Sequence, residues 1–283
     1  MMRNEGDSNS ERRVGVEFLR TLIEWFRPFQ SALVAFSSGV DSSLVALAAY
    51  RALGQRAFAV TSISPSFARR ELLEARKIAK EIGIELVEVE QDDLNSVDYV
   101  MNQVSRCYFC RSNLVRAIQP ILKERKPQVC VDGTHLDDMS SPRPGIKALR
   151  EGGFRSPLAE LGMRKEDVRR VARLVGLSNS EKPSEACLSS RIAYGQAIDT
   201  KTLRMIEDSE EFIRQITSAS VVRVRTIGTH AVIELNSDSI EEARRKFAKI
   251  ETRLRALGYS SVELDPEGYK PGKMLSLFVQ NRP

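Results

Sequence analysis

The sequence has few cysteines and no long apolar run. Its 283 residues include 4 Cys, and its polar N-terminus, MMRNEGDSNSERR, lacks the apolar core of a signal peptide. No later stretch is long enough to span a bilayer. We therefore expect no membrane association and a cytoplasmic, reducing environment. There, the four cysteines are thiols or ligands and not disulfides.

A strong excess of charge of either sign is also absent. The chain has 43 Lys and Arg against 38 Asp and Glu, a formal net charge of +5. This mildly basic balance suits a protein that binds an anionic small molecule, and it does not require nucleic acid as a partner. The sequence also lacks an evident RNA-binding appendage such as paired zinc ribbons.

Short apolar runs alternate with helical patterns in the first half of the chain. The runs are 32–36, 57–63, 85–90 and 129–133, and the helical patterns are 42–53, 68–82 and 111–124. This alternation predicts an α/β domain with a parallel sheet covered on both faces. Ligands bind beyond the carboxyl ends of such strands, so loops 37–42, 62–67 and 133–139 are expected to form the site.

The second half has a different pattern. Residues 140–160, rich in Pro, Gly and Arg, predict a loop, followed by a helix near 164–175 and a loop at 182–195. From 199 the sequence predicts a smaller α+β domain with helices at 199–217 and 239–257 and strands at 221–225, 231–235 and 261–264. The expected organisation is a disordered segment 1–13, an α/β domain 14–198 and an α+β domain 199–283.

The stretch LVAFSSGVDSS (33–43) carries a buried strand directly into a helix through small residues. Backbone N–H groups of such a turn and the helix N-terminus can hold a phosphate, with Mg²⁺ accommodating Asp41. The candidate residues are Ser37, Ser38, Gly39, Val40, Asp41 and Ser42. The Gly-Lys-Ser/Thr signature of a Walker loop is absent. An ordinary serine-capped helix is the alternative interpretation.

The same stretch resembles the S-G-G-x-D-S signature of the PP-loop, or N-type, ATP pyrophosphatases, which have the adenine nucleotide alpha hydrolase-like fold. The resemblance implies that ATP is split between its α and β phosphates and adenylates a substrate. Ser38 replaces the first glycine of the signature, which costs about 1 kcal/mol if the position needs a positive φ.

A second segment, DGTHLDD (132–138), resembles the G-T-N-x-D-D segment of related synthetases. It adds Gly133 and Thr134, together with Ser62 of the 62–67 loop, to the expected ATP-binding residues. Asp138 joins Asp41 as an expected Mg²⁺ ligand. A solvated acidic turn is the alternative interpretation of this segment.

The segments 143–177 and 182–198, the run VRVR and the segment ELDPEGYKPGKM resemble the ATP-dependent sacrificial sulfur transferases, the LarE family. The likeness covers nearly the whole chain from residue 14. It implies insertion of sulfur into a pyridinium dicarboxylate mononucleotide, the precursor of the nickel-pincer cofactor of lactate racemase. The carboxylate is adenylated with release of pyrophosphate, and a sulfur nucleophile then expels AMP to leave a thiocarboxylate. Homo-oligomers are expected, since other members of the family assemble.

Three arginines are the expected substrate ligands. Arg223 and Arg225 alternate on a predicted strand and so share a face. They resemble the family's pair that grips the substrate phosphate. Arg191 follows Cys187 by four residues and is expected to hold a carboxylate or phosphate near the reacting sulfur. Simple solvation is the alternative for each of these arginines.

The stretch RCYFC (106–110) gives Cys107 and Cys110 metal-ligand spacing. The resemblance aligns Cys187 with the family's sulfur-carrying cysteine, which in some members is itself the donor and ends as dehydroalanine. Other members bind a [4Fe-4S] cluster through three cysteines, which implies Cys107, Cys110 and Cys187 here. The remaining cysteine, Cys130, lies within a predicted strand and is expected to be a small buried hydrophobe.

Zinc is a weaker interpretation of these cysteines, since a structural zinc site normally has four protein ligands and only His135 and His230 could complete it. Two incidental cysteines and a redox C-x-x-C also remain open. Two alternative functions remain as well: a PP-loop tRNA thiolase, and a non-catalytic nucleotide-binding or sulfur-carrier protein.

Overall fold

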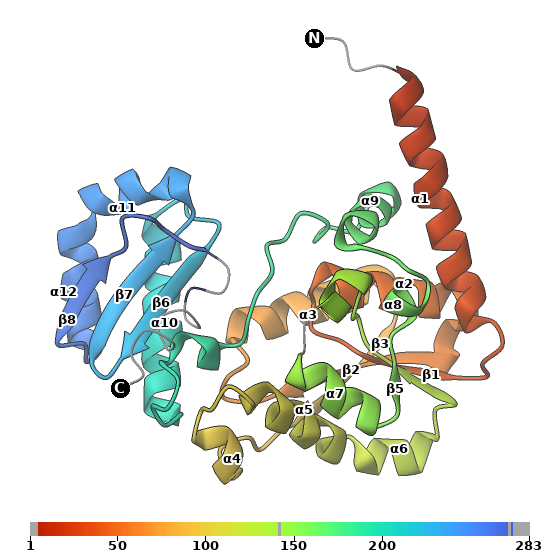
Figure 1. Cartoon of the computed structure of the whole chain (residues 1–283), viewed down its shortest axis with the longest axis horizontal. Coiled ribbons are helices and arrows are strands. Elements are labelled where there is room, and N and C mark those ends of the chain that lie inside the picture. Colours follow the sequence, from red (N-terminus) through yellow and green to blue (C-terminus); the bar gives the residue numbers. More distant parts are fainter. Residues whose placement is uncertain (1–4, 141–142, 271–272, 274–283) are drawn as a thin grey trace. The chain divides into compact units, whose positions relative to one another are not determined.

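The computed structural model describes residues 5–140, 143–270 and 273 (Figure 1). The chain divides into two compact units. Unit 1 comprises residues 1–64, 69–92 and 107–184, and unit 2 comprises 65–68, 93–106 and 185–283. The second unit thus begins before the expected boundary at 199. The reason is that the loop from Glu185 is hydrogen-bonded within unit 2: Leu188 N donates to Ser66 O (2.9 Å), and Gly195 N donates to Asn102 O (3.1 Å).

Unit 1 is built on a five-stranded parallel sheet with the order β3-β2-β1-β4-β5. The strands are β1 (Ala32–Ala35), β2 (Ala57–Ile63), β3 (Glu85–Glu90), β4 (Val129–Val131) and β5 (Phe154–Arg155). The central strands are short, apolar and buried, as expected when both faces of a sheet are covered. The predicted parallel α/β fold is confirmed.

Helices cover both faces of this sheet (Figure 1). They are α1 (Glu5–Phe26), α2 (Val40–Leu53), α3 (Arg69–Ile82), α5 (Arg106–Ala117), α6 (Gln119–Arg125), α7 (Pro144–Glu151), α8 (Pro157–Glu160) and α9 (Lys165–Val175). Side chains of α1, α2, α3 and α9 form one apolar core with the sheet. Side chains of α5, α6 and α7 form a second core against Leu33, Phe58 and Val60.

Two sequence expectations for unit 1 differ from the structure. The segment 140–160 is not a loop, since it contains α7, β5 and α8. Pro144 and Pro157 each occupy the first turn of a helix, where proline is tolerated. The helix α1 begins at Glu5, inside the segment 1–13 that was expected to be disordered.

Unit 2 contains a three-stranded sheet with the order β6-β7-β8, in which β6 and β7 are antiparallel and β7 and β8 parallel. Its main elements are α4 (Val97–Val100), α10 (Thr200–Ile216), β6 (Val222–Ile227), β7 (His230–Leu235), α11 (Ile240–Arg245), α12 (Phe247–Leu257) and β8 (Ser261–Leu264). Apolar side chains of α10, α11 and α12 pack on one face of the sheet. The single helix predicted for 239–257 is divided in two at Lys246.

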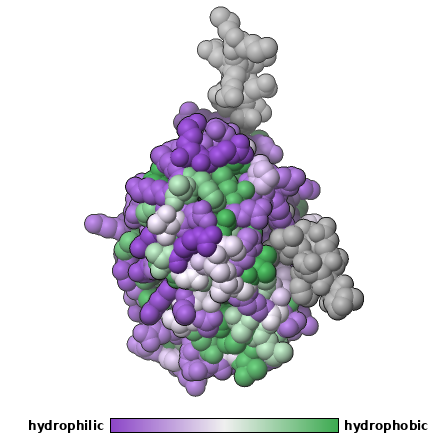
Figure 2. Space-filling model, turned by 90° about the vertical axis from the view of Figure 1, so that its left-hand side faces the viewer, coloured by the Kyte–Doolittle hydropathy of each residue, from purple (hydrophilic) through white to green (hydrophobic). Residues whose placement is uncertain are grey.

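Among the described residues, no helix combines the length and the apolarity needed to cross a membrane. The face of the molecule in Figure 2 is largely hydrophilic, with apolar residues in separate small areas. The C-terminal motif residues Gly272 and Met274, which contributed to the family resemblance, lie outside the described residues.

Candidate active site

The predicted phosphate loop joins β1 to α2 in unit 1. Gly39 caps α2, and its carbonyl accepts hydrogen bonds from Ser43 N (3.0 Å) and Ser42 Oγ (3.1 Å). Ser37 is exposed, and its N–H donates to Ser42 Oγ (3.2 Å). The loop is thus closed on itself at the start of α2, with Val40 and Asp41 in the first turn. This arrangement of small residues at a helix N-terminus is suited to an anion.

Ser38 has φ of 56°, so the position that the signature assigns to glycine does need the left-handed conformation. Gly39, in contrast, has φ of −72° and is extended. The serine therefore carries the backbone strain anticipated from the sequence, about 1 kcal/mol. Its side chain is fully buried, and its hydroxyl lies within hydrogen-bond distance of Glu71 and Lys182.

Gly133 lies against this loop from the neighbouring strand β4. A Cβ at Gly133 would lie 2.7 Å from Ser42 N and 3.0 Å from Asp41 C, both backbone atoms. Only glycine permits such a close backbone approach. The segments 37–42 and 132–134 are therefore brought together at the carboxyl ends of β1 and β4, as predicted from the sequence.

This contact makes Gly133→Ala a test of the loop. We expect the added methyl to displace the first turn of α2 and to raise KM for ATP by about tenfold or more, since no flexible side chain can yield. Steady-state kinetics of pyrophosphate release at varied ATP would measure it. Gly176→Asn is the matched control, because Gly176 has open space around it and a left-handed conformation that asparagine tolerates. An unchanged KM for Gly133→Ala would contradict the role of this contact.

Asp132, at the end of β4, is a buried carboxylate that holds the next residues in place. Its Oδ1 accepts from Thr134 N (2.8 Å) and Ser156 Oγ (2.9 Å). Its Oδ2 is buried and has no hydrogen-bond partner within the described part of the chain. Thr134 is itself nearly buried.

Lys165, which sequence analysis missed, lies beside the loop. Its Nζ donates to Asp41 Oδ1 (2.8 Å) and Oδ2 (2.6 Å). The two residues are 124 positions apart in sequence, so no local pattern could have shown the pair. A lysine on the aspartate of a phosphate loop supplies positive charge where the phosphates of ATP would lie.

The two expected Mg²⁺ ligands have protein partners in the structure. Asp41 pairs with Lys165, and Asp138 pairs with Arg143 (2.7 Å). Across residues 5–140, 143–270 and 273, no group of three His, Cys, Asp or Glu side chains is arranged to hold a metal ion. Magnesium in nucleotide sites takes one or two carboxylates and several phosphate oxygens. The carboxylate of Asp41 therefore fits a metal that arrives with ATP.

The cysteines are divided between the two units. Cys107 and Cys110 belong to α5 of unit 1, spaced so that both lie on one side of the helix. Cys107 is exposed, and Cys110 Sγ receives a hydrogen bond from Gln91 Nε2 (3.6 Å). Cys187 belongs to unit 2.

Ser62, one of the expected ATP-binding residues, lies near the carboxyl end of β2 and is half-buried.

Cys130 is partly buried in β4 and packs with the second core of unit 1, as expected for a small hydrophobe. Burial raises the pKa of its thiol to about 11. It is therefore the cysteine least suited to supply a thiolate.

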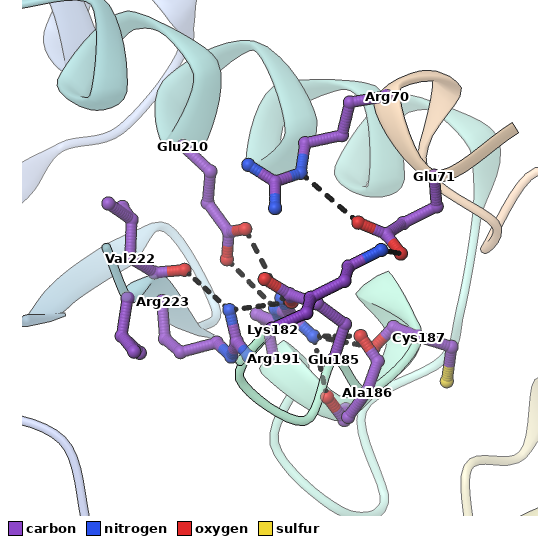
Figure 3. A network of polar contacts seen from close by, with 12 residues as sticks. Arg70, Glu71, Lys182, Glu185, Ala186, Cys187, Arg191, Glu210, Val222 and Arg223 are labelled. Carbon is purple, nitrogen blue, oxygen red and sulfur yellow. Dashed lines mark hydrogen bonds and ion pairs between the residues drawn. The ribbon is translucent and has the colours of Figure 1, made fainter. Parts of the chain in front are cut away.

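In unit 2, Cys187 precedes a short 3-10 helix, Leu188–Arg191, that is anchored by Arg191 (Figure 3). Arg191 is 2% exposed and donates to Glu210 through Nε (2.8 Å) and Nη2 (3.2 Å). Its Nη1 donates to the carbonyls of Ala186 and Cys187. The Cys187 side chain points away from this cluster (Figure 3). Arg191 thus fixes the backbone that carries the sulfur, while contact with a substrate anion stays a prediction.

Glu210 is fully buried on α10 and also accepts from Arg214 Nη2 (3.2 Å) and Val224 N (3.1 Å). Burial alone would raise the pKa of Glu210, but the charge and hydrogen bonds of Arg191, with Arg214, hold it below its ordinary value. Glu210 therefore stays ionised and joins α10, β6 and the Cys187 segment.

Arg223 and Arg225 lie on one face of β6, and the alternate residues Val222 and Val224 enter the apolar core on the other. Arg223 pairs with Glu185 (2.8 Å), and Arg225 pairs with Glu234 (2.8 Å). Burial and the nearby Arg191 charge lower the pKa of Arg223. The cluster of Arg191, Arg214 and Arg223 with Glu185 and Glu210 keeps one positive charge in excess, which suits an anionic ligand.

The parallel sheet, the loop at its carboxyl edge and the lysine on Asp41 define an ATP-using enzyme of the PP-loop class. Consistent with this, residues 13–117 match the NAD synthase family. The chain is also 27% identical to a glutamine-hydrolyzing GMP synthase component of Archaeoglobus fulgidus, over 52% of this chain and 51% of that protein.

Two relatives match along nearly the whole length. The chain is 38% identical to an uncharacterized protein of Synechocystis sp., over 90% of this chain and 96% of that protein. It is 30% identical to pyridinium-3,5-bisthiocarboxylic acid mononucleotide synthase of Lactiplantibacillus plantarum, over 90% of this chain and 92% of that enzyme. The chain therefore belongs to the LarE family, and it is an ATP-dependent sulfurtransferase.

Proposed function

We propose that this enzyme converts a carboxylate of a pyridinium dicarboxylate mononucleotide into a thiocarboxylate, a step of nickel-pincer cofactor synthesis. The observation that carries the proposal is the similarity to the Lactiplantibacillus plantarum synthase over 92% of that enzyme. A match of this extent includes both units, whereas the similarity to the GMP synthase component covers about half of the chain.

The first chemical step is adenylation. A carboxylate oxygen of the substrate attacks the α-phosphorus of ATP, and the bond to the bridging oxygen breaks with release of pyrophosphate. The loop residues Ser37, Gly39, Val40 and Ser42 would hold the phosphates, with Gly133, Thr134 and Ser62 nearby on the sheet edge. Lys165 would move from Asp41 to the polyphosphate, which frees Asp41 to hold Mg²⁺.

Adenylation is needed because a carboxylate oxygen is a poor leaving group, whereas AMP is a good one. A sulfur nucleophile then attacks the acyl carbon, and the C–O bond to AMP breaks with its electron pair. The substrate's own phosphate would be held by Arg223 and Arg225, the arginines that share a face of β6. Their partners, Glu185 and Glu234, keep both guanidinium groups oriented.

Cys187 is the proposed sulfur-bearing residue, and two sources of sulfur fit the chain. In the first, the Cys187 thiolate attacks the acyl carbon and expels AMP. Later removal of the Cys187 Cα proton by a base breaks the Cβ–Sγ bond, so that the sulfur leaves with its electron pair as the substrate thiocarboxylate and dehydroalanine remains in the protein. In the second, the three thiolates of Cys107, Cys110 and Cys187 would hold a [4Fe-4S] cluster, as the family resemblance implies. A cluster held by three thiolates would keep one iron open and supply a binding position for sulfide.

The cluster is tested by Cys107→Ala. Protein purified or reconstituted without oxygen is expected to contain about four iron and four sulfide per chain with broad visible absorbance, and Cys107→Ala is expected to lose both. Cys130→Ala is the control, since Cys130 belongs to the core of unit 1. Wild-type protein that stays free of iron after reconstitution would reject the cluster and leave the sacrificial route.

The function as a whole is tested by pyrophosphate release. ATP and Mg²⁺ with the pyridinium mononucleotide should release pyrophosphate and AMP, and mass spectrometry should find oxygen replaced by sulfur in the substrate. Release that depends on tRNA, or no release with either substrate, would contradict the proposal. The first outcome would identify a thiolase of tRNA instead.

A further inference from the structure

The side chain of Ser38, an expected ATP-binding residue, is fully buried in the phosphate loop. The residue has no exposed surface in the protein without ligand, although its neighbour Ser37 is exposed. A group with no accessible surface cannot touch an incoming ligand unless the loop rearranges. Its hydroxyl is instead directed to protein groups behind the loop, where a glycine would have no side chain at all.

Two side chains hold the Ser38 hydroxyl. It donates to Glu71 Oε2 (3.3 Å) and lies within hydrogen-bond distance of Glu71 O (3.4 Å), and it accepts from Lys182 Nζ (3.3 Å). Lys182 and Glu71 also pair directly, with Nζ to Oε2 at 2.7 Å, and both side chains are largely buried. Glu71 belongs to the first turn of α3, and Lys182 to the segment after α9.

The carboxyl group of Glu71 is held in its ionised form in the folded protein. Burial would raise the pKa of Glu71, but the hydrogen bond and charge of Lys182, with a contribution from Arg70, lower it below the ordinary value. A buried charged pair that also bonds the Ser38 hydroxyl is costly to separate, since either partner alone would be left uncompensated.

A third side chain holds the Ser38 backbone. Asn179 Nδ2 donates to Ser38 O (2.9 Å) and to Ser43 Oγ (2.8 Å). Because Ser43 is buried in α2, Asn179 joins the loop to the helix that follows it. The loop is therefore held from behind through both the side chain and the carbonyl of its strained residue.

We propose that Glu71, Lys182 and Asn179 are positioning residues for ATP, which act by holding Ser38 in the left-handed conformation that the phosphate loop requires. The inference rests on the proposed ATP site at this loop. Serine at this position loses the freedom of glycine and gains hydroxyl contacts with Glu71 and Lys182, while Asn179 holds the backbone carbonyl. A loop ordered before ATP arrives binds it without the free-energy cost of ordering.

The test is a double-mutant cycle on ATP binding, with Ser38→Gly and Lys182→Met measured by calorimetry using α,β-methylene-ATP and Mg²⁺. We expect Lys182→Met to weaken binding about tenfold in the wild-type background, and much less in the Ser38→Gly background, where no hydroxyl is left to hold. Glu71→Gln should weaken binding in the same direction, and Lys182→Arg should largely restore it. Lys77→Met, an exposed lysine on the same α3, is the control and should bind like wild type.

Each result decides between roles. Equal losses from Lys182→Met in both backgrounds would overturn the proposal, because that result means Lys182 contacts the phosphates directly. Unchanged binding by Lys182→Met and Glu71→Gln would overturn it as well. If wild-type protein fails to bind the analogue, the ATP site at this loop is wrong, and the inference falls with it. Thermal unfolding of each variant would show whether it is folded. If Lys182→Met does not fold, Glu71→Gln tests the same contact.

Discussion

Replacement of Cys187 by serine is expected to lower thiocarboxylate formation by at least about a thousandfold while pyrophosphate is still released from ATP. A serine hydroxyl has no sulfur to give, and its hard oxygen is a poor substitute for the thiolate that an iron–sulfur cluster prefers, so the substitution impairs both proposed sulfur routes. Cys187 is not among the residues proposed to hold ATP, so the substitution leaves those residues unchanged. Mass spectrometry of the substrate and a pyrophosphate assay on the same sample would separate the two steps.

The matched control is Cys130→Ser, which changes a thiol with no expected part in the chemistry. Because Cys130 packs in the core of unit 1, its stability should be checked by thermal unfolding, and its sulfur transfer should stay near wild type once folded. If Cys187→Ser forms product at the rate of Cys130→Ser, Cys187 is not the sulfur-bearing residue. If Cys187→Ser loses pyrophosphate release as well as sulfur transfer, Cys187 is needed before the sulfur step.

The wild-type protein also distinguishes the two sulfur routes. A sacrificial Cys187 should lose the mass of one hydrogen sulfide, and product should not exceed one sulfur per chain. Cluster-based transfer leaves Cys187 intact and allows repeated turnover when sulfide is supplied. Intact-protein mass before and after the reaction is therefore the direct measurement.

Much of the fold follows from local sequence patterns. The runs 57–63, 85–90 and 261–264 are strands with the predicted bounds, because continuous apolar or alternating residues leave few other ways to bury them. The segment 140–160 could not be predicted in this way. Pro144 and Pro157 look like helix breakers but lie in the first turns of helices, and β5 is a two-residue strand, too short to show any period.

The site was predictable where it is local and not where it depends on packing. The loop 37–42 and its glycine neighbour Gly133 follow from two motifs after two strands. The pairs of Asp41 with Lys165 and of Glu71 with Lys182 join residues 124 and 111 positions apart, and they exist because the tertiary fold brings α9 and the segment after it to the phosphate loop and to α3. Arg191 could be recognised as important from its motif, but its partner Glu210 lies on a helix whose position no motif specifies.

Replacement of Glu210 by glutamine is expected to destabilise unit 2 by about 3 kcal/mol, since it removes the carboxylate nearest to the buried guanidinium of Arg191 and the carboxylate that pairs with the partly buried Arg214. Arg191 and Arg214 would lose charge-assisted hydrogen bonds, and Val224 N would keep only a neutral acceptor. Because the pKa of Glu210 lies below its ordinary value of 4.5, its contribution is present above that pH and is lost as pH falls through the folded pKa. The difference in free energy of unfolding between Glu210→Gln and wild type should therefore be constant near neutral pH and should become smaller at acidic pH. Urea unfolding followed by far-UV circular dichroism at several pH values would measure it.

Glu211→Gln is the matched control, because Glu211 is the exposed neighbour on the same helix and should change stability by less than about 0.5 kcal/mol. Equal unfolding midpoints for the two variants would mean that the buried cluster does not hold unit 2 together. If the Glu210→Gln protein still folds, we expect it to transfer sulfur more slowly than wild type. Arg191 fixes the carbonyls of Ala186 and Cys187 only while Glu210 holds its guanidinium in place, so loss of this one carboxylate loosens the backbone that carries the sulfur.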